Sequence, residues 1–181
     1  MKICLDAGHG GFTGARGNGL IEDDLALDFV KRVGHHLRAA GVQTVVTRNI
    51  DTFVTLDYRA SLAVREKCDL FVSFHHNAGP TLAHGCEIFV AAGDNRSKAK
   101  AKTVLDRICA GGAMKSRGVK WDNRSQHTSL YVLQATYRKM PAMLIELGFL
   151  TNMGDASWLN DKNWREAISI KIAAVLAEVA K

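Results

Sequence analysis

His9 is the first of several side chains in the 181-residue sequence whose type and position suit metal binding. It follows a short apolar run, residues 3–5, at the point where the chain breaks into glycines. Glycine permits a sharp turn at positive φ and a close approach of the backbone to a ligand. A histidine held there projects from the carboxyl end of a strand, where open α/β sheets place their ligands. A tight turn with an exposed histidine fits this stretch equally well, so other ligands must decide.

A second strand-like run ends in two further histidines. The apolar run at residues 70–74 is typical of a strand that is covered on both faces. It is followed directly by His75, His76 and Asn77. A lone histidine at such a position would usually be structural. Two histidines at a strand end, in a chain that already has His9 at another, favour a metal site.

Two glutamates complete the set of candidate groups. Glu22 lies at or just before the first turn of a predicted helix, where an acid can complement the helix dipole or point back toward His9. Glu146 lies near the end of an apolar run, residues 140–147. A carboxylate inside such a run is costly to bury without a partner, so Glu146 is the acid most in need of an explanation.

These groups suggest one kind of chemistry. Two histidines and a glutamate form the three-ligand set of a catalytic zinc, with a fourth position open for water. A second glutamate beside the metal can carry a proton from water to a leaving nitrogen. Spacing alone leaves open which of the two glutamates has which role.

The elements that must position these groups alternate between strand and helix. Strands are expected at residues 3–5, 42–47, 69–77, 85–91 and 140–147. Helices are expected from residue 23 to about 41, from 56 to about 68, at 97–110 and at 164–179. This alternation predicts an α/β fold with a mostly parallel sheet, in which the carboxyl ends of the strands share one edge.

The remaining segments are expected to be irregular. Residues 10–19, with five glycines, and residues 111–128 are predicted as loops, and residues 129–133 as a short strand or turn. The second loop is expected near the site, with Trp121 and His127 as candidate substrate contacts. Arg48, Asp51 and Arg59 follow or flank the second strand. The two arginines could hold that loop together or face the substrate, and the structural role is the preferred interpretation.

The net charge of +6 and the isoelectric point of about 9.3 favour an anionic partner. Nucleic acid, an anionic membrane surface and an acidic wall polymer are the candidates. The basic residues do not form one block with interleaved aromatic residues, so direct recognition of nucleic acid is not indicated.

Length and composition indicate one domain, residues 1–181, with a sizeable core. The four cysteines contain no CxxC pair, and Cys4 and Cys86 lie in apolar runs, so neither a disulfide framework nor a cysteine zinc site is required. No signal peptide and no transmembrane segment are predicted. We expect either release by another route or earlier removal of a leader.

Taken in order, the motifs resemble the zinc-dependent N-acetylmuramoyl-L-alanine amidases of the Amidase_3 type over nearly the whole chain. The resemblance rests on these residues: Leu5-Asp6-Ala7-Gly8-His9-Gly10-Gly11, Glu22, Thr47-Arg48 with Asp51 and Arg59, Ser73-Phe74-His75-His76-Asn77-Ala78, and the run from Pro141 to Asn152. Each motif alone is moderately specific, and all of them in this order are highly specific.

The resemblance implies that His9, Glu22 and His75 bind zinc and that Glu146 is the catalytic acid/base. The family pattern Ser-x-His-x-Asn selects His75 over His76, and strand alternation agrees, because neighbouring side chains point to opposite faces. The implied fold is a single α/β domain with a mixed, mostly parallel sheet and helices on both faces. The implied reaction is hydrolysis of the peptidoglycan amide between the lactyl group of N-acetylmuramic acid and the L-alanine of the stem peptide.

Two departures from the family refine this expectation. Residues 120–129, with His127, match no pattern that can be aligned. The chain also has neither the long helical insert that plugs the site of partner-activated members nor an added wall-binding domain. It therefore looks most like a phage or prophage endolysin, made in the cytoplasm without a signal peptide and acting on the wall or periplasm once the membrane is opened. We expect a monomer whose positive charge contacts anionic wall or outer-membrane polymers.

Two alternatives remain at the level of sequence. One is another zinc hydrolase that acts on wall peptides or acetamides, such as a carboxypeptidase or a deacetylase. The other is a non-catalytic wall-binding module that uses the same cleft. The presence of all four groups argues against the binding module, since Glu146 would be expected to be lost first.

Overall fold

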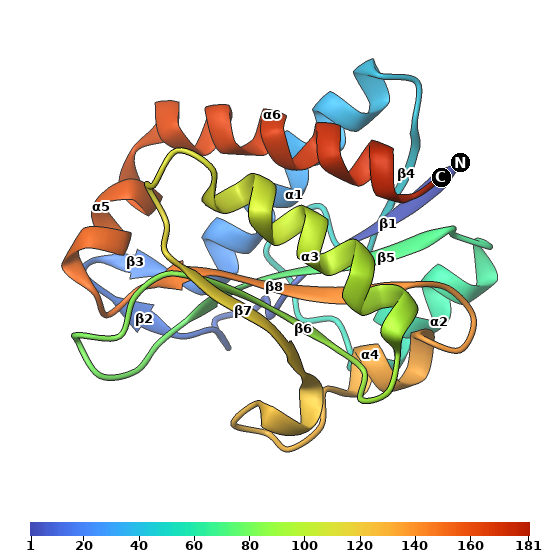
Figure 1. The fold of residues 1–181 in the computed structure, drawn as a ribbon, viewed down its shortest axis with the longest axis horizontal. Helices are drawn as coiled ribbons and strands as arrows, with labels where there is room; N and C mark the ends of the chain where they lie inside the picture. The colour runs from blue at the N-terminus through green and yellow to red at the C-terminus, as the bar shows by residue number, and fades with distance from the viewer.

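The computed structural model describes all 181 residues and is built around one six-stranded sheet (Figure 1). In spatial order the strands are β4 (Gln43–Val46), β1 (Lys2–Ala7), β5 (Leu70–Asn77), β8 (Ala142–Phe149), β6 (Cys86–Val90) and β7 (Ser116–Trp121). All neighbours run parallel except β8 and β6, which are antiparallel. The predicted mixed, mostly parallel sheet is therefore confirmed.

Helices cover both faces of the sheet, as predicted. They are α1 (Glu22–Ala39), α2 (Leu56–Arg65), α3 (Asn95–Cys109), α4 (Tyr131–Thr136), α5 (Met153–Asn160) and α6 (Lys162–Val179). Figure 1 shows α1, α3 and α6 on one side of the sheet, and α2 and α4 on the other, near the end of the sheet that holds the two termini. No helix combines the length and the apolar composition that a membrane crossing requires.

The two faces carry cores of different size, because successive strand residues point to opposite sides. Val72 and Phe74 of β5 point into a cluster of 33 buried apolar residues beneath α1, α3 and α6. Phe71 of β5 and Leu144 of β8 point into a cluster of 11 residues beneath α2 and α4. Nearer the carboxyl ends of the same two strands, this second face carries His75 of β5 and Glu146 of β8. Polar side chains therefore line this face beyond the smaller core.

The small-core face continues as a line of acidic and histidine side chains across three strands. His75 on β5 is the register partner of Glu146 on β8, and Glu146 is the register partner of Glu87 on β6. Directly paired residues project from the same face of a sheet. We refer to His75, Glu146 and Glu87 as the polar row.

Several predictions for irregular segments were wrong. Residues 116–121 of the predicted loop form β7, and a helix, α4, replaces the strand or turn expected at 129–133. As an edge strand, β7 has no fully buried residue, so it lacks the apolar run that identifies inner strands. The glycine-rich loop contains a two-stranded hairpin of β2 (Arg16–Gly17) and β3 (Leu20–Ile21), and α5 was not predicted.

Candidate metal centre

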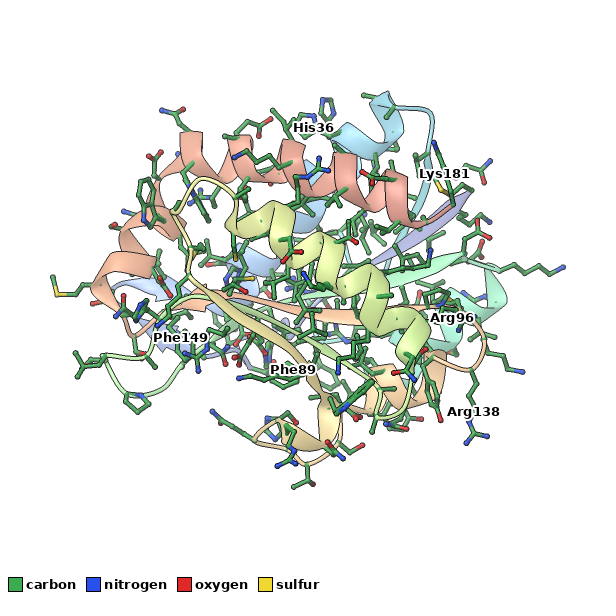
Figure 2. The ribbon with its side chains drawn as sticks, in the orientation of Figure 1. His36, Phe89, Arg96, Arg138, Phe149 and Lys181 are labelled. Carbon is green, nitrogen blue, oxygen red and sulfur yellow. The ribbon has the colours of Figure 1, made fainter.

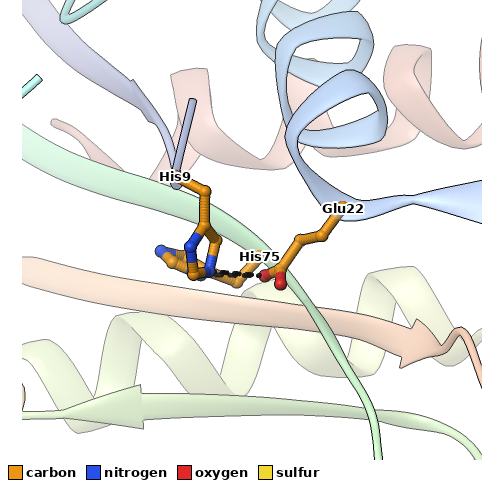
Figure 3. Close-up of side chains that lie close together, drawn as sticks. All are labelled: His9, Glu22 and His75. Atoms are coloured by element: carbon orange, nitrogen blue, oxygen red, sulfur yellow. Dashed lines mark hydrogen bonds and ion pairs between the residues drawn. The ribbon is translucent and has the colours of Figure 1, made fainter. Parts of the chain in front are cut away.

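His9, Glu22 and His75 come together at the carboxyl edge of the sheet (Figure 3). His9 lies just after β1, Glu22 is the first residue of α1, and His75 lies on β5. Glu22 Oε1 is 3.2 Å from His9 Nε2 and 3.1 Å from His75 Nδ1. The two imidazole rings meet edge to face, with their centroids 4.9 Å apart.

This arrangement fits a tetrahedral zinc site. The ligand atoms that the three residues offer all lie within 4.8 Å of one another. Zinc binds nitrogen and carboxylate oxygen at about 2.1 Å, which places tetrahedral ligand atoms about 3.4 Å apart. The distances of 3.2 and 3.1 Å from Glu22 Oε1 to the two imidazole nitrogens are close to that value. The donor set of two histidines and one carboxylate is also that of known catalytic zinc sites.

Backbone groups orient the Glu22 carboxylate. Its Oε2 accepts a hydrogen bond from the Ala15 backbone N–H at 2.9 Å, and its Oε1 accepts one from the His76 backbone N–H at 3.0 Å. The residue is only 3% exposed. Glu22 is therefore held in one orientation by α1, by the glycine-rich loop and by β5, and a carboxylate so held is preorganised for a ligand role.

The electrostatics of the cluster favour a carboxylate that remains ionised. Burial alone would raise the pKa of Glu22, but hydrogen bonds from His75 and His9 outweigh it and hold the pKa well below its usual range. Burial alone would lower the pKa of His9, but the hydrogen bond and charge of Glu22 outweigh it and raise that pKa. A negative group that attracts two imidazoles in this way also attracts a metal cation.

His76 is excluded from the cluster by its direction. It projects from the opposite face of β5, where its ring lies 5.5 Å from that of Phe29 and its Nδ1 lies 2.7 Å from the Leu147 carbonyl oxygen. Burial lowers the pKa of His76 to about 4, so the ring is neutral at physiological pH. His75, and not His76, therefore lies in the cluster.

Glu146 lies beside the cluster and has no partner of its own. Its Oε2 is enclosed and makes no hydrogen bond. Burial, together with the negative charges of Glu22 and Glu87, raises the pKa of Glu146 well above its usual range. Buried polar atoms are nearly always hydrogen-bonded, so an orphaned carboxyl beside a candidate metal site indicates a group that exchanges protons or binds a ligand.

A buried ion pair supports the loop that carries His9. Asp6 on β1 and Arg59 on α2 are 2.7 Å apart and almost fully buried. The Asp6 carboxylate also accepts hydrogen bonds from the hydroxyls of Thr47 and Ser73, each at 2.6 Å. Arg59 in turn donates to the backbone carbonyl of His9. The position of the His9 backbone therefore depends on this pair.

Arg48 and Asp51 also have structural contacts in this region. Arg48 donates to the carbonyls of Ala7, Gly8 and Asp23, and Asp51 accepts from the Gly11 backbone N–H. Burial and the nearby charge of Arg59 lower the pKa of Arg48. Both arginines are buried, and their donors go to backbone carbonyls and, for Arg59, also to Asp6, so the geometry supports the structural interpretation of Arg48 and Arg59.

Residues 120–129 form the end of β7 and the turn that leads to α4. Trp121 packs against the larger core, with the Lys98 ammonium 4.1 Å from its ring centroid. His127 is exposed in the segment before α4. The segment is anchored by Asp122, whose carboxylate accepts hydrogen bonds from Ala92, Leu130 and Gln134. The predicted role of His127 in substrate contact stays a prediction.

Sequence reasoning missed the groups at the far end of the polar row. Glu87 binds Arg117 and Lys120 of β7 and Asn77 of β5. A signal for Glu87 was present, because it is a carboxylate within an apolar strand, as Glu146 is. The two cations were missed because their strand was predicted to be a loop.

Comparison with known proteins identifies related chains. The sequence model of the Amidase_3 family, described as N-acetylmuramoyl-L-alanine amidase, matches residues 3–178. The N-acetylmuramoyl-L-alanine amidase LytC of Bacillus subtilis is 35% identical over 168 residues, covering 91% of this chain. The match covers only 32% of LytC, so this chain spans about a third of that protein's length.

Solved structures share the whole fold. The N-acetylmuramoyl-L-alanine amidase AmiC2 of Nostoc punctiforme superposes with a TM-score of 0.88 at 31% identity, covering 98% of this chain and 96% of AmiC2. The catalytic domain of CD27L, an endolysin that targets Clostridia difficile, superposes with a TM-score of 0.78 at 25% identity, covering 98% of this chain and 97% of that domain.

The first prediction concerns Gly8, which packs against the His75 ring. A Cβ atom at position 8 would lie 2.4 Å from His75 Nε2, so Gly8→Ala must displace the ring without changing any ligand. We expect the affinity for Zn²⁺, measured by competition with a chelating dye, to fall about tenfold or more. Gly79→Ala is the control, because its Cβ would make only an ordinary contact at 3.6 Å with Phe149. Unchanged zinc affinity in Gly8→Ala would contradict the assigned geometry.

Proposed function

Because the chain belongs to the Amidase_3 family of N-acetylmuramoyl-L-alanine amidases, we propose that it hydrolyses the amide between N-acetylmuramic acid and the L-alanine of the stem peptide in peptidoglycan. The observation that carries this proposal is the meeting of His9, Glu22 and His75 with an unpartnered Glu146 on the adjacent strand. The proposed hydrolysis needs a metal site and a proton carrier at one edge of the sheet, and this constellation supports both roles.

Zinc is the proposed cofactor, held by His9, Glu22 and His75. Its usual ligands are nitrogen, sulfur and carboxylate oxygen, and amide hydrolysis requires no redox change. When bound, zinc activates a water molecule and polarises the carbonyl group of the substrate. The hydrogen bonds from Ala15 and His76 to Glu22 hold one of the three ligands in place for this role.

Glu146 is the proposed acid/base. In hydrolysis the water oxygen bonds to the amide carbon, the C–N bond breaks, and a proton must reach the departing nitrogen. Glu146 takes the proton from the attacking water on its carboxylate and delivers it to that nitrogen. No hydrogen bond from a neighbouring side chain or backbone group fixes the protonation of this carboxyl at Oε2, which supports the role of a proton carrier.

The proposed site of action is the cell wall, with an endolysin-like role. The similarity to the CD27L catalytic domain supports this role, and the similarity to LytC and AmiC2 supports the wall as substrate. We also propose that the chain acts as a monomer, since all four candidate groups come from one chain.

Product analysis separates this proposal from its rivals. An amidase releases new alanine amino groups from digested peptidoglycan and leaves the glycan strands intact. A carboxypeptidase or deacetylase acting through the same zinc site would release other products, and a non-catalytic wall-binding module would release none. Mass analysis of digests from walls of two stem chemistries distinguishes these outcomes.

The second prediction concerns the metal. We expect one zinc per chain after dialysis, no zinc in His75→Ala, and loss of wall hydrolysis on chelation with recovery when zinc is added back. Elemental analysis measures the metal independently of activity. His35→Ala, which removes an exposed histidine of α1, should keep its zinc. A His75→Ala protein with full zinc content would rule out this ligand set.

The third prediction concerns Glu146. The substitution Glu146→Gln keeps the shape of the side chain and removes its ability to carry a proton. We expect a folded protein that retains its zinc and loses turnover by about 10²–10⁴-fold. Glu178→Gln, at an exposed position of α6, should leave turnover unchanged.

The opposite outcome for Glu146 has a defined meaning. If Glu146→Gln lost its zinc and regained activity when zinc was added, Glu146 would be a ligand. Glu22 would then become the candidate acid/base. Metal content and turnover must therefore be measured on the same preparation.

The fourth prediction concerns the net charge of +6. We propose that this charge promotes docking on anionic wall or outer-membrane polymers. Salt shortens the range of such attraction to about 8 Å at physiological ionic strength. The rate of lysis of whole walls should therefore fall as salt rises, while hydrolysis of a small uncharged muropeptide should not. Lysis rates that are independent of salt would contradict the proposal.

A further inference from the structure

Two cations that the proposed chemistry does not use lie next to the polar row, at its Glu87 end. Arg117 and Lys120 lie on β7, the edge strand beside β6. Arg117 Nε donates to Glu87 Oε2 at 2.8 Å, and Lys120 Nζ donates to the same oxygen at 2.5 Å. The polar row of His75, Glu146 and Glu87 therefore has a candidate metal ligand at one end and a pair of positive charges beside the other.

Glu87 fixes the two cations in place. It is 5% exposed, and its second oxygen accepts a hydrogen bond from Asn77 Nδ2 at 3.2 Å. Burial alone would raise the pKa of Glu87, but its hydrogen bonds with Lys120 and Arg117 outweigh it and lower the pKa. Glu87 is therefore ionised at physiological pH and acts as a fixed counter-ion.

The pair has more charge and more donors than Glu87 can use. Two cations share one carboxylate, which leaves an excess of one positive charge. The Arg117 and Lys120 side chains are 31% and 33% exposed, whereas Glu87 is almost enclosed. Beyond Glu87, Arg117 makes one long hydrogen bond, 3.3 Å, to the His84 carbonyl, and Lys120 makes none. Neutralising Glu87 would need only one of the two cations.

Aromatic rings limit the movement of both side chains. The Arg117 guanidinium lies 4.8 Å from the centroid of Phe149, and the Lys120 ammonium lies 5.9 Å from that of Phe89. Both rings are labelled in Figure 2. Phe89 lies on β6 and Phe149 on β8, the strands that carry Glu87 and Glu146. Cations held in this way lose little freedom on binding an anion, which favours binding.

We propose that Arg117 and Lys120 form a subsite for a carboxylate of the substrate, one residue beyond the alanine whose amide is cleaved. This inference rests on the proposed amidase function. Lysine and arginine are the usual partners of a carboxylate in charge-assisted hydrogen bonds.

The distances are of the right size for such a subsite. The strand that carries the cations is two strand spacings, about 10 Å, from the strand that carries Glu146. The charged groups lie closer than that, because they reach back to Glu87. Two residues of extended peptide span about 7 Å, so a substrate amide at Glu146 places the next residue's carboxylate near the cations.

The experiment uses two synthetic muropeptides that differ only in the second residue of the stem, which carries a free α-carboxylate in one and a carboxamide in the other. We expect the zinc-loaded protein to have a KM about tenfold lower for the carboxylate form. In Lys120→Gln this preference should fall to about twofold or less through KM, and Lys120→Arg should restore it. Lys102→Gln removes the same charge from an exposed position on α3, on the other face, and should change nothing.

Calorimetric titration with the free stem peptides provides a readout without turnover. The carboxylate peptide should bind the unmodified protein more tightly than the carboxamide peptide, and this difference should disappear in Lys120→Gln. Equal KM values and equal binding of the two forms would overturn the subsite. Failure to cleave either muropeptide would instead overturn the proposed amidase function, and the titration would still test the subsite.

Discussion

The buried ion pair of Asp6 and Arg59 determines where the candidate site can form. Removing one partner of such a pair typically costs about 3–5 kcal/mol, because a charge is left buried and unpaired. Here the pair is completed by the hydroxyls of Thr47 and Ser73, so the Asp6 carboxylate is fully satisfied. The other hydrogen bonds of Arg59 go to the backbone carbonyls of Ala7, His9 and Val54. The turn after β1 requires positive φ at His9 itself, which an L-residue adopts only when its surroundings impose it.

The buried network around Asp6 positions the candidate site because alternate residues of a strand project from the same face of the sheet. Ser73, which donates to Asp6, lies two positions before His75 on β5, so both side chains project from the same face of the sheet. Gly8 directly follows β1, two positions after Asp6, and its lack of a Cβ atom leaves room for the His75 ring. The candidate metal ligands are therefore fixed by a sheet edge, a turn and a helix start that share one buried network.

Much of this arrangement could be predicted from the sequence, for physical reasons that differ between segments. Apolar runs identified β5 and β8 because inner strands are buried on both faces, and the polar residues that interrupt those runs, His75 and Glu146, are conspicuous for the same reason. The edge strand β7 was missed because it has polar, half-exposed residues and a glycine. The interactions of Glu87 with Arg117 and Lys120 could not be inferred, because they depend on the pairing of β6 with β7, which no local pattern specifies.

The reversed direction of β6 relative to β8 has an evolutionary consequence. On β5 and β8 the site residues lie near the ends of their strands, whereas Glu87 and Arg117 lie near the beginnings of β6 and β7. The segments that lead into these two strands, residues 78–85 and 110–115, therefore border the same edge as the candidate metal cluster. Insertions or deletions in these segments would reshape the rim beside the cations without altering the strand pairing that holds His75 and Glu146. Substrate preference and hydrolytic chemistry can in this way diverge separately within one fold.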